Sequence, residues 1–140
     1  MIKKIYNNHK EIINYLIFGI LTTIISLTTY YLLVITILNP NKPIQLQIAN
    51  IISWITCVTF AYFTNRKYVF NSTNKSIKSE IIKFYFSRLL VLLIDMLLMY
   101  ILVSILHYND KIIKIIVQII VIIINYIVSK LIIFKKSKEL

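Results

Sequence analysis

The sequence predicts an all-α integral membrane protein, a four-helix bundle of two repeated helical hairpins with both chain ends in the cytoplasm. Its composition, its four long apolar runs and its uneven distribution of Lys and Arg support this prediction. The 140 residues are 59% hydrophobic and 15% charged, with a mean hydropathy of +0.79. A soluble chain of this length cannot bury so much apolar surface in one core. We therefore expect residues 1–140 to form a single transmembrane domain.

The apolar runs predict the membrane-spanning helices, which we place at about residues 12–38, 44–64, 84–106 and 112–134. Each run has roughly 20 residues or more, and a rise of about 1.5 Å per residue carries such a helix across about 30 Å of hydrocarbon. Ile and Val favour strands in water, but in lipid a single run must satisfy its own backbone hydrogen bonds and is therefore helical. Polar turn formers separate the runs and pair the helices as two hairpins; they lie at residues 39–43, 71–76 and 108–111.

The distribution of positive charge predicts the orientation of the helices. The net charge is +11, and thirteen of the sixteen Lys and Arg residues fall in the two tails, the central loop and the adjoining helix ends. Only Lys42, Lys111 and Lys114 fall on the opposite side. Cytoplasmic loops of membrane proteins carry an excess of Lys and Arg, so both termini and the central loop should be cytoplasmic. Positive charge beside apolar runs also favours membrane lipids, and not nucleic acid, as the partner.

The chain lacks the residues that several kinds of binding or catalytic site require. With one Gly, the chain has no Gly-rich phosphate loop, and its single Cys57 excludes an internal disulfide or a Cys-based zinc site. His9 and His107 lie too far apart in sequence to suggest a metal cluster. We find no catalytic grouping and little chain outside the membrane, and we therefore expect a protein without a cofactor that is not an enzyme.

The two halves of the chain resemble each other. The ends of the second and fourth helices share an aromatic residue, a basic residue and a terminal Phe at a constant offset, namely Tyr62, Arg66, Val69 and Phe70 against Tyr126, Lys130, Ile133 and Phe134. The starts of the first and third helices also correspond, with residues 15–18 against 84–87. Because both halves begin on the same side of the membrane, the repeat is parallel and not inverted.

These paired helix ends resemble the GtrA-like family, whose members are four-helix proteins built from two halves. The first copy of the motif holds Asn65, Arg66 and Lys67 before Val69-Phe70, and the second holds Asn125, Ser129 and Lys130 before Ile133-Phe134. The resemblance covers nearly the whole chain. It implies a role in cell-surface polysaccharide or teichoic-acid glycosylation, in which a polyprenyl-phosphate-linked sugar is flipped from the cytoplasmic to the outer leaflet.

A basic rim at the cytoplasmic interface is the predicted binding site for the lipid-linked phosphate. Arg can hold phosphate through two parallel hydrogen bonds, whereas Lys acts as a point charge. The candidate headgroup-binding residues are Asn65, Arg66, Lys67, Arg88 and Lys130. The alternative is that these cations only fix the topology and extend their charges toward the headgroups.

Three polar residues within the apolar runs form a predicted polar path for the sugar. Asp95, in the middle of the third run, costs about 2.5–3.5 kcal/mol on insertion scales and should face the bundle interior. Gln118 and Asn125 carry amides that are poorly placed against lipid. The alternatives for Asp95 are a proton-coupled site and a protonated or hydrogen-bonded tie between helices. The alternative for the amides is helix packing.

The predicted localisation is the bacterial plasma membrane, crossed several times. The predicted partners are the polyprenyl-phosphate sugar, membrane lipids, a membrane glycosyltransferase and a second copy of the chain. Two other functions stay open: an accessory subunit that anchors a glycosyltransferase, and a small multidrug efflux pump. The strong charge bias argues against the pump, because small pumps of that kind often insert in both orientations.

Overall fold

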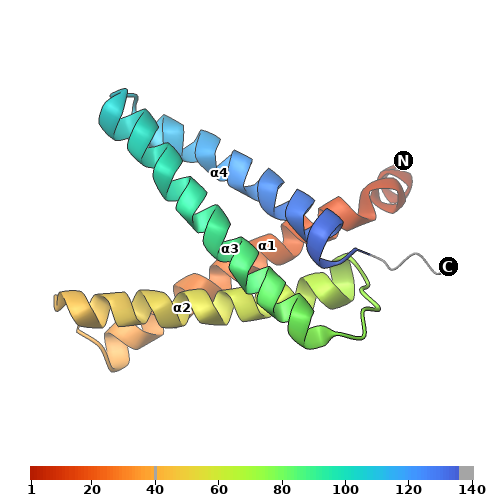
Figure 1. Cartoon of the computed structure of the whole chain (residues 1–140), viewed down its shortest axis with the longest axis horizontal. Helices are drawn as coiled ribbons and strands as arrows, with labels where there is room; N and C mark the ends of the chain where they lie inside the picture. The colour runs from red at the N-terminus through yellow and green to blue at the C-terminus, as the bar shows by residue number, and fades with distance from the viewer. Residues whose placement is uncertain (40, 136–140) are drawn as a thin grey trace. The chain divides into compact units, whose positions relative to one another are not determined.

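The computed structural model describes residues 1–39 and 41–135, and it is built from helices (Figure 1). Four long helices follow one another as α1 (Ile2–Thr36), α2 (Pro43–Thr64), α3 (Ile77–Met99) and α4 (Asp110–Val128). The last three continue into short π-helical segments, η1 (Asn65–Val69), η2 (Tyr100–Ile105) and η3 (Ser129–Ile133). Pro40, Lys136 and Lys138, which also entered the predictions above, lie outside the described residues, as do the side chains of Lys111 and Lys114.

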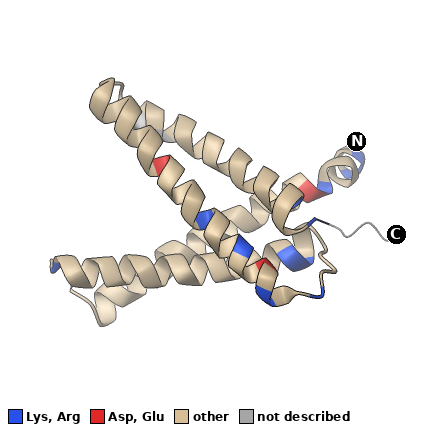
Figure 2. Ribbon diagram, viewed as in Figure 1, with Lys and Arg blue, Asp and Glu red and all other residues tan. Residues whose placement is uncertain are grey.

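All four helices are long and apolar enough to cross a membrane. The candidate spans are Ile2–Thr36, Pro43–Val69, Ile77–Ile105 and Ile115–Ile133. Figure 2 shows long stretches of α2 and α4 without a charged residue. A helix of this length satisfies its backbone hydrogen bonds internally and leaves its apolar side chains to contact lipid. The prediction of an all-α integral membrane protein is therefore confirmed.

Two helices begin well before the predicted positions. α1 starts at Ile2 instead of near residue 12, and α3 starts at Ile77 instead of near residue 84. The backbone of His9 is non-helical (φ −123°, ψ 21°) and marks a kink between the polar N-terminal turns of α1 and its apolar part. Hydropathy detects only the part of a helix that lies in lipid, whereas backbone hydrogen bonding continues into the polar flanks.

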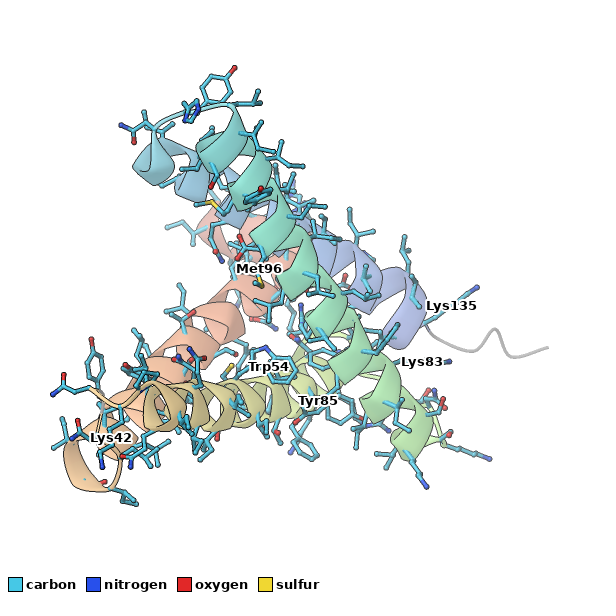
Figure 3. The ribbon with its side chains drawn as sticks, turned by 60° about the vertical axis from the view of Figure 1, so that its left-hand side comes forward. Lys42, Trp54, Lys83, Tyr85, Met96 and Lys135 are labelled. Carbon is cyan, nitrogen blue, oxygen red and sulfur yellow. The ribbon has the colours of Figure 1, made fainter. Side chains whose placement is uncertain are left out.

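The chain divides into two compact units, Met1–Asn71 and Ser72–Leu140, and each unit is a helical hairpin. The first hairpin pairs α1 with α2 and η1, and the second pairs α3 with α4 and η3. We call the connected side of each hairpin its closed end and the other side its open end. Figure 3 shows Lys42 at the closed end of the first hairpin, and Lys83 and Lys135 at the open end of the second. The predicted pairing of the helices is confirmed within each hairpin.

A hydroxyl pair ties α1 to α2 in the first hairpin. Ser53 is 4% exposed, and its Oγ donates to the backbone oxygen of Ser26 at 2.6 Å and lies 2.9 Å from the Ser26 Oγ. Small residues such as Ala49 and Ser53 let helix backbones approach closely, and hydrogen bonds then add to the packing, since lipid supplies no hydrophobic force between helices.

We expect Ser53→Ala to destabilise the first hairpin by about 1 kcal/mol, because it removes the hydroxyl that bonds to Ser26. The measurement is the equilibrium unfolding of the purified protein in mixed micelles. Thr56→Ala is the matched control, since the exposed Thr56 hydroxyl donates only to Ile52 in its own helix. Equal stability of the two variants would show that the Ser26–Ser53 contact contributes nothing.

Candidate functional site

The open ends of the two hairpins repeat the same aromatic contact. In the first hairpin the ring centroids of Tyr15 and Phe70 lie 6.4 Å apart, and in the second those of Phe84 and Phe134 lie 5.8 Å apart. Tyr15 and Phe84 are the first residues of the two matched helix starts, and Phe70 and Phe134 are the last residues of the two matched helix ends. These contacts therefore support the internal repeat in three dimensions.

At each open end, the second helix of the hairpin finishes in the same π-helical turn. The backbone N–H of Phe70 donates to the oxygen of Asn65, and that of Phe134 donates to the oxygen of Ser129, both at 2.9 Å. Asn65 is 4% exposed and Ser129 is 1% exposed. Hydrogen bonds from residue i+5 to residue i widen a helix locally and occur frequently at functional sites. The widened turns place the motif residues at equivalent positions of the two hairpins.

In the first hairpin, η1 carries three of the predicted headgroup-binding residues. Asn65 is buried, Arg66 is half-buried and Lys67 is exposed, with its Nζ 5.2 Å from the centroid of the Tyr68 ring. The Tyr68 ring stacks on that of Phe18 at a centroid distance of 5.3 Å. Contact with α1 therefore orders the turn that presents Arg66 and Lys67.

In the second hairpin, Arg88 connects α3 to η3. Its guanidinium carbon lies 4.5 Å from the centroid of the Phe84 ring, and its Nη2 donates to the Oγ of Ser129 at 3.4 Å. Phe84 in turn packs against Phe134. The aromatic ring and the hydroxyl hold this half-buried cation in place between α3 and η3.

Lys130 follows Ser129 and lies at the surface of the second hairpin. Its Nζ donates to the Oη of Tyr126 at 3.3 Å and lies 5.5 Å from the centroid of that ring. Because Arg88 contacts Ser129, it lies next to the residue that precedes Lys130. Arg66, which matches Lys130 in the sequence repeat, occupies the corresponding position of the first hairpin.

The three residues of the predicted polar path have different surroundings. Asp95 is half-buried on α3, and its spacing from Phe84, Arg88 and Val91 puts it on the helix face that packs against α4. Asn125 is half-buried on α4, and its Oδ1 atom is buried. Gln118 is exposed on the second hairpin, so its own hairpin does not shield the amide.

Glu80, a buried residue at the open end of the second hairpin, is not among the site residues predicted from the sequence. Its side chain is 1% exposed, and its Oε2 accepts a hydrogen bond from the Oγ of Ser72 at 2.8 Å. This bond ties the loop before α3 to the helix itself. The repeat carries a usable signal, since Glu11 lies one helical turn before Tyr15 just as Glu80 lies one turn before Phe84.

Comparison with known proteins agrees with this architecture. The family model of the GtrA/DPMS transmembrane domain matches residues 14–134. Two similar proteins, from Listeria monocytogenes and Listeria innocua, are both named cell wall teichoic acid glycosylation protein GtcA. The first is 42% identical over 131 residues, which cover 91% of this chain and 87% of the relative. The second is 42% identical over 135 residues, which cover 94% and 90% of the two chains.

A membrane protein of Bacillus subtilis, YwcD, is 37% identical over 128 residues, which cover 89% of this chain and 97% of the relative. No solved structure gives a significant match. The family model spans both hairpins and both π-helical turns described above. The chain therefore belongs to the family of the GtrA/DPMS transmembrane domain.

Proposed function

We propose that this protein moves a polyprenyl-phosphate-linked sugar from the cytoplasmic to the outer leaflet of the bacterial plasma membrane, for the glycosylation of teichoic acid. The observation that carries this proposal is the 42% identity, over nine-tenths of the chain, to proteins named for cell wall teichoic acid glycosylation. Such glycosylation takes place outside the cytoplasm, whereas activated sugars are made inside it. A lipid-linked sugar must therefore cross the membrane.

The chemistry of the open ends suits a phosphate headgroup. With both open ends facing the cytoplasm, each hairpin contributes cations at the depth where a lipid phosphate lies. Arg66 and Lys67 come from the first hairpin, and Arg88 and Lys130 from the second. We propose that these cations, joined by Asn65 in the first hairpin, bind lipid phosphate at the open end of their own hairpin while the polyprenyl tail stays in lipid. Asp95, Gln118 and Asn125 then offer polar contacts to the sugar.

In this proposal the two hairpins act as one transmembrane domain that transports the sugar without changing it. The direction of movement follows from consumption of the sugar donor on the outer side. A glycosyltransferase and a second copy of the chain are proposed partners. An accessory subunit that anchors a glycosyltransferase is the rival function, and it requires no movement of lipid.

A translocation assay distinguishes these two functions. The purified full-length protein is reconstituted in vesicles of phosphatidylcholine and phosphatidylglycerol that contain a polyprenyl phosphate bearing labelled glucose, galactose or N-acetylglucosamine. Periodate, which does not cross the bilayer, oxidises only sugars in the outer leaflet. We expect the protein to make the inner pool of at least one probe accessible. If no probe exchanges faster than in protein-free vesicles, the proposed function is wrong and the accessory role is favoured.

A further inference from the structure

We infer that residues 2–8, the first turns of α1, form an amphipathic helix that lies on the cytoplasmic surface of the bilayer and binds anionic phospholipid. We call these residues the N-terminal segment. The inference goes beyond the proposed function, because it assigns a lipid-binding surface that the movement of a sugar does not require. It depends on the predicted orientation, with both open ends in the cytoplasm. Three observations carry it: the kink at His9, the two faces of the segment and the contact of Tyr6.

α1 is too long to lie within the hydrocarbon over its whole length. Its 35 residues reach about 50 Å at a rise of about 1.5 Å per residue, whereas the hydrocarbon core is about 30 Å thick. The non-helical backbone of His9 ends the first helical stretch. The N-terminal turns change direction at this kink (Figure 1). The N-terminal segment can therefore leave the line of the membrane-spanning part and run along the membrane surface.

The side chains of the N-terminal segment divide into an apolar face and a polar face. Ile2, Ile5 and Tyr6 follow spacings of three and four residues and share a face about 100° wide. Ile2 is 86% exposed and Ile5 is 53% exposed, so the described part of the chain leaves this face largely uncovered. The other positions of the segment carry Lys3, Lys4, Asn7 and Asn8. An apolar face opposite a basic, polar one is typical of helices that lie in the membrane interface.

The contact of Tyr6 indicates which way the apolar face points. The Oη of Tyr6 donates to the Oδ1 of Asn14 at 3.3 Å. In a straight helix these two residues would lie about 12 Å apart along the axis, so the kink brings them together. Asn14 lies beyond the kink, on the part of α1 that continues into the apolar run. The face that carries Tyr6 therefore points toward the bilayer.

A second hydrogen bond fixes this arrangement to the rest of the first hairpin. The Nδ2 of Asn14 donates to the backbone oxygen of Tyr68 at 3.3 Å. Asn14 thus joins the N-terminal segment on one side to η1 on the other. This amide holds the segment at the open end, at the depth where α1 enters the membrane.

The charge of the segment selects anionic lipid as the occupant of its surface. Lys3 and Lys4 are exposed, and the first acidic residue of the chain is Glu11. Figure 2 shows Lys residues on the N-terminal turns of α1. The attraction of Lys to an anionic leaflet falls off within about 8 Å at physiological ionic strength. Because α1 crosses the membrane directly after the kink, the segment stays near the leaflet and even weak binding suffices.

The test measures the environment of nitroxide labels on the full-length protein in nanodiscs that hold one copy each. In a Cys57→Ser background, single cysteines replace Ile5 on the apolar face and Asn8 on the polar face. With phosphatidylglycerol present, we expect oxygen, which concentrates in lipid, to reach the label on Ile5→Cys. A water-soluble nickel chelate should reach the label on Asn8→Cys. In phosphatidylcholine alone this difference should decrease, because the lysines lose their attraction to the surface.

The double variant Lys3→Gln with Lys4→Gln should release the segment from the lipid. Each lysine near an anionic surface strengthens binding about fivefold, so the ratio of lipid-bound to free label on Ile5→Cys should fall roughly twenty-fivefold. Lys75→Gln with Lys78→Gln is the matched control, since it removes two exposed lysines around the start of α3. The control should leave the ratio unchanged. Equal ratios for the two double variants would overturn the inference.

The same labels identify another occupant. A label on Ile5→Cys that stays accessible to the chelate in phosphatidylglycerol nanodiscs would show that the lipid surface does not cover the apolar face. If that label becomes inaccessible only in micelles at high protein concentration, a second copy of the chain covers the face and the inference is wrong.

This inference and the proposed function can fail separately. If the label on Ile5→Cys lies in lipid but no sugar-bearing probe moves in the periodate assay, the lipid-binding surface stands and the translocation proposal fails. If the probe moves while the label on Ile5→Cys stays in water, translocation stands and the lipid-binding surface fails.

Discussion

Replacing Arg66 and Lys130 together by Gln is expected to reduce translocation of the polyprenyl-phosphate sugar to the rate of protein-free vesicles. The two residues occupy equivalent positions at the open ends of the two hairpins. A hydrogen bond to a charged group is worth about 1.5–3 kcal/mol, so the loss of each cation should weaken phosphate binding by at least roughly tenfold. Each single variant should therefore retain part of the activity. The measurement is the periodate assay on reconstituted vesicles.

A double variant with the same change in charge controls for this effect. Lys42→Gln with Lys75→Gln also removes two cations; both are exposed, one before α2 and one in the loop before α3. We expect it to translocate at the wild-type rate, and both double variants to unfold at the wild-type temperature. Wild-type translocation by the Arg66 and Lys130 double variant would remove both residues from the binding site.

Truncation of Phe134, the last motif residue of the second hairpin, should lower the free energy of unfolding more than Ser53→Ala or Phe86→Ala does. Phe134 is 3% exposed, and its ring packs against Phe84, which also supports Arg88. We expect Phe134→Ala to lower the free energy of unfolding by roughly 3 kcal/mol. This is the lower end of the range for buried Phe in soluble proteins, because lipid adds no hydrophobic contribution. Unfolding in mixed micelles measures the change.

Phe86→Ala is the control for this truncation, because Phe86 lies on the same hairpin with 60% of its surface exposed. Its replacement should change the free energy of unfolding by less than about 1 kcal/mol. Similar losses for the two variants would mean that the Phe84–Phe134 contact does not stabilise the open end.

The number, pairing and apolar extent of the helices could be predicted from the sequence because lipid leaves few alternatives. A run of about 20 apolar residues must form a helix, and polar turns between runs must reverse the chain. Where the helices begin could not be predicted from the same signal. Residues 2–11 and 77–83 mix charged and polar residues with apolar ones and are still part of the helices, and the kink at His9 has no Pro or Gly to mark it.

The candidate site was predictable only in part. The repeat identified Arg66 and Lys130, because aromatic, basic and terminal Phe residues recur together. It did not indicate that the Arg88 guanidinium lies over the Phe84 ring. It also did not indicate that Arg88 contacts Ser129, because these two residues lie on helices that are far apart along the chain. Most Glu residues lie at the surface, so the sequence pattern does not indicate that Glu80 is buried beside Ser72.

The proposed mechanism requires both open ends to face the cytoplasm, and cysteine labelling tests this requirement most directly. In a Cys57→Ser background, single cysteines replace Asn8 and Thr73 near the open ends and Asn41 and Tyr108 at the closed ends. In intact cells, we expect an impermeant maleimide to label Asn41→Cys and Tyr108→Cys. Asn8→Cys and Thr73→Cys should react only after permeabilisation. Labelling of Asn8→Cys or Thr73→Cys in intact cells would place an open end outside the cell and contradict the proposed capture of phosphate from the cytoplasmic leaflet.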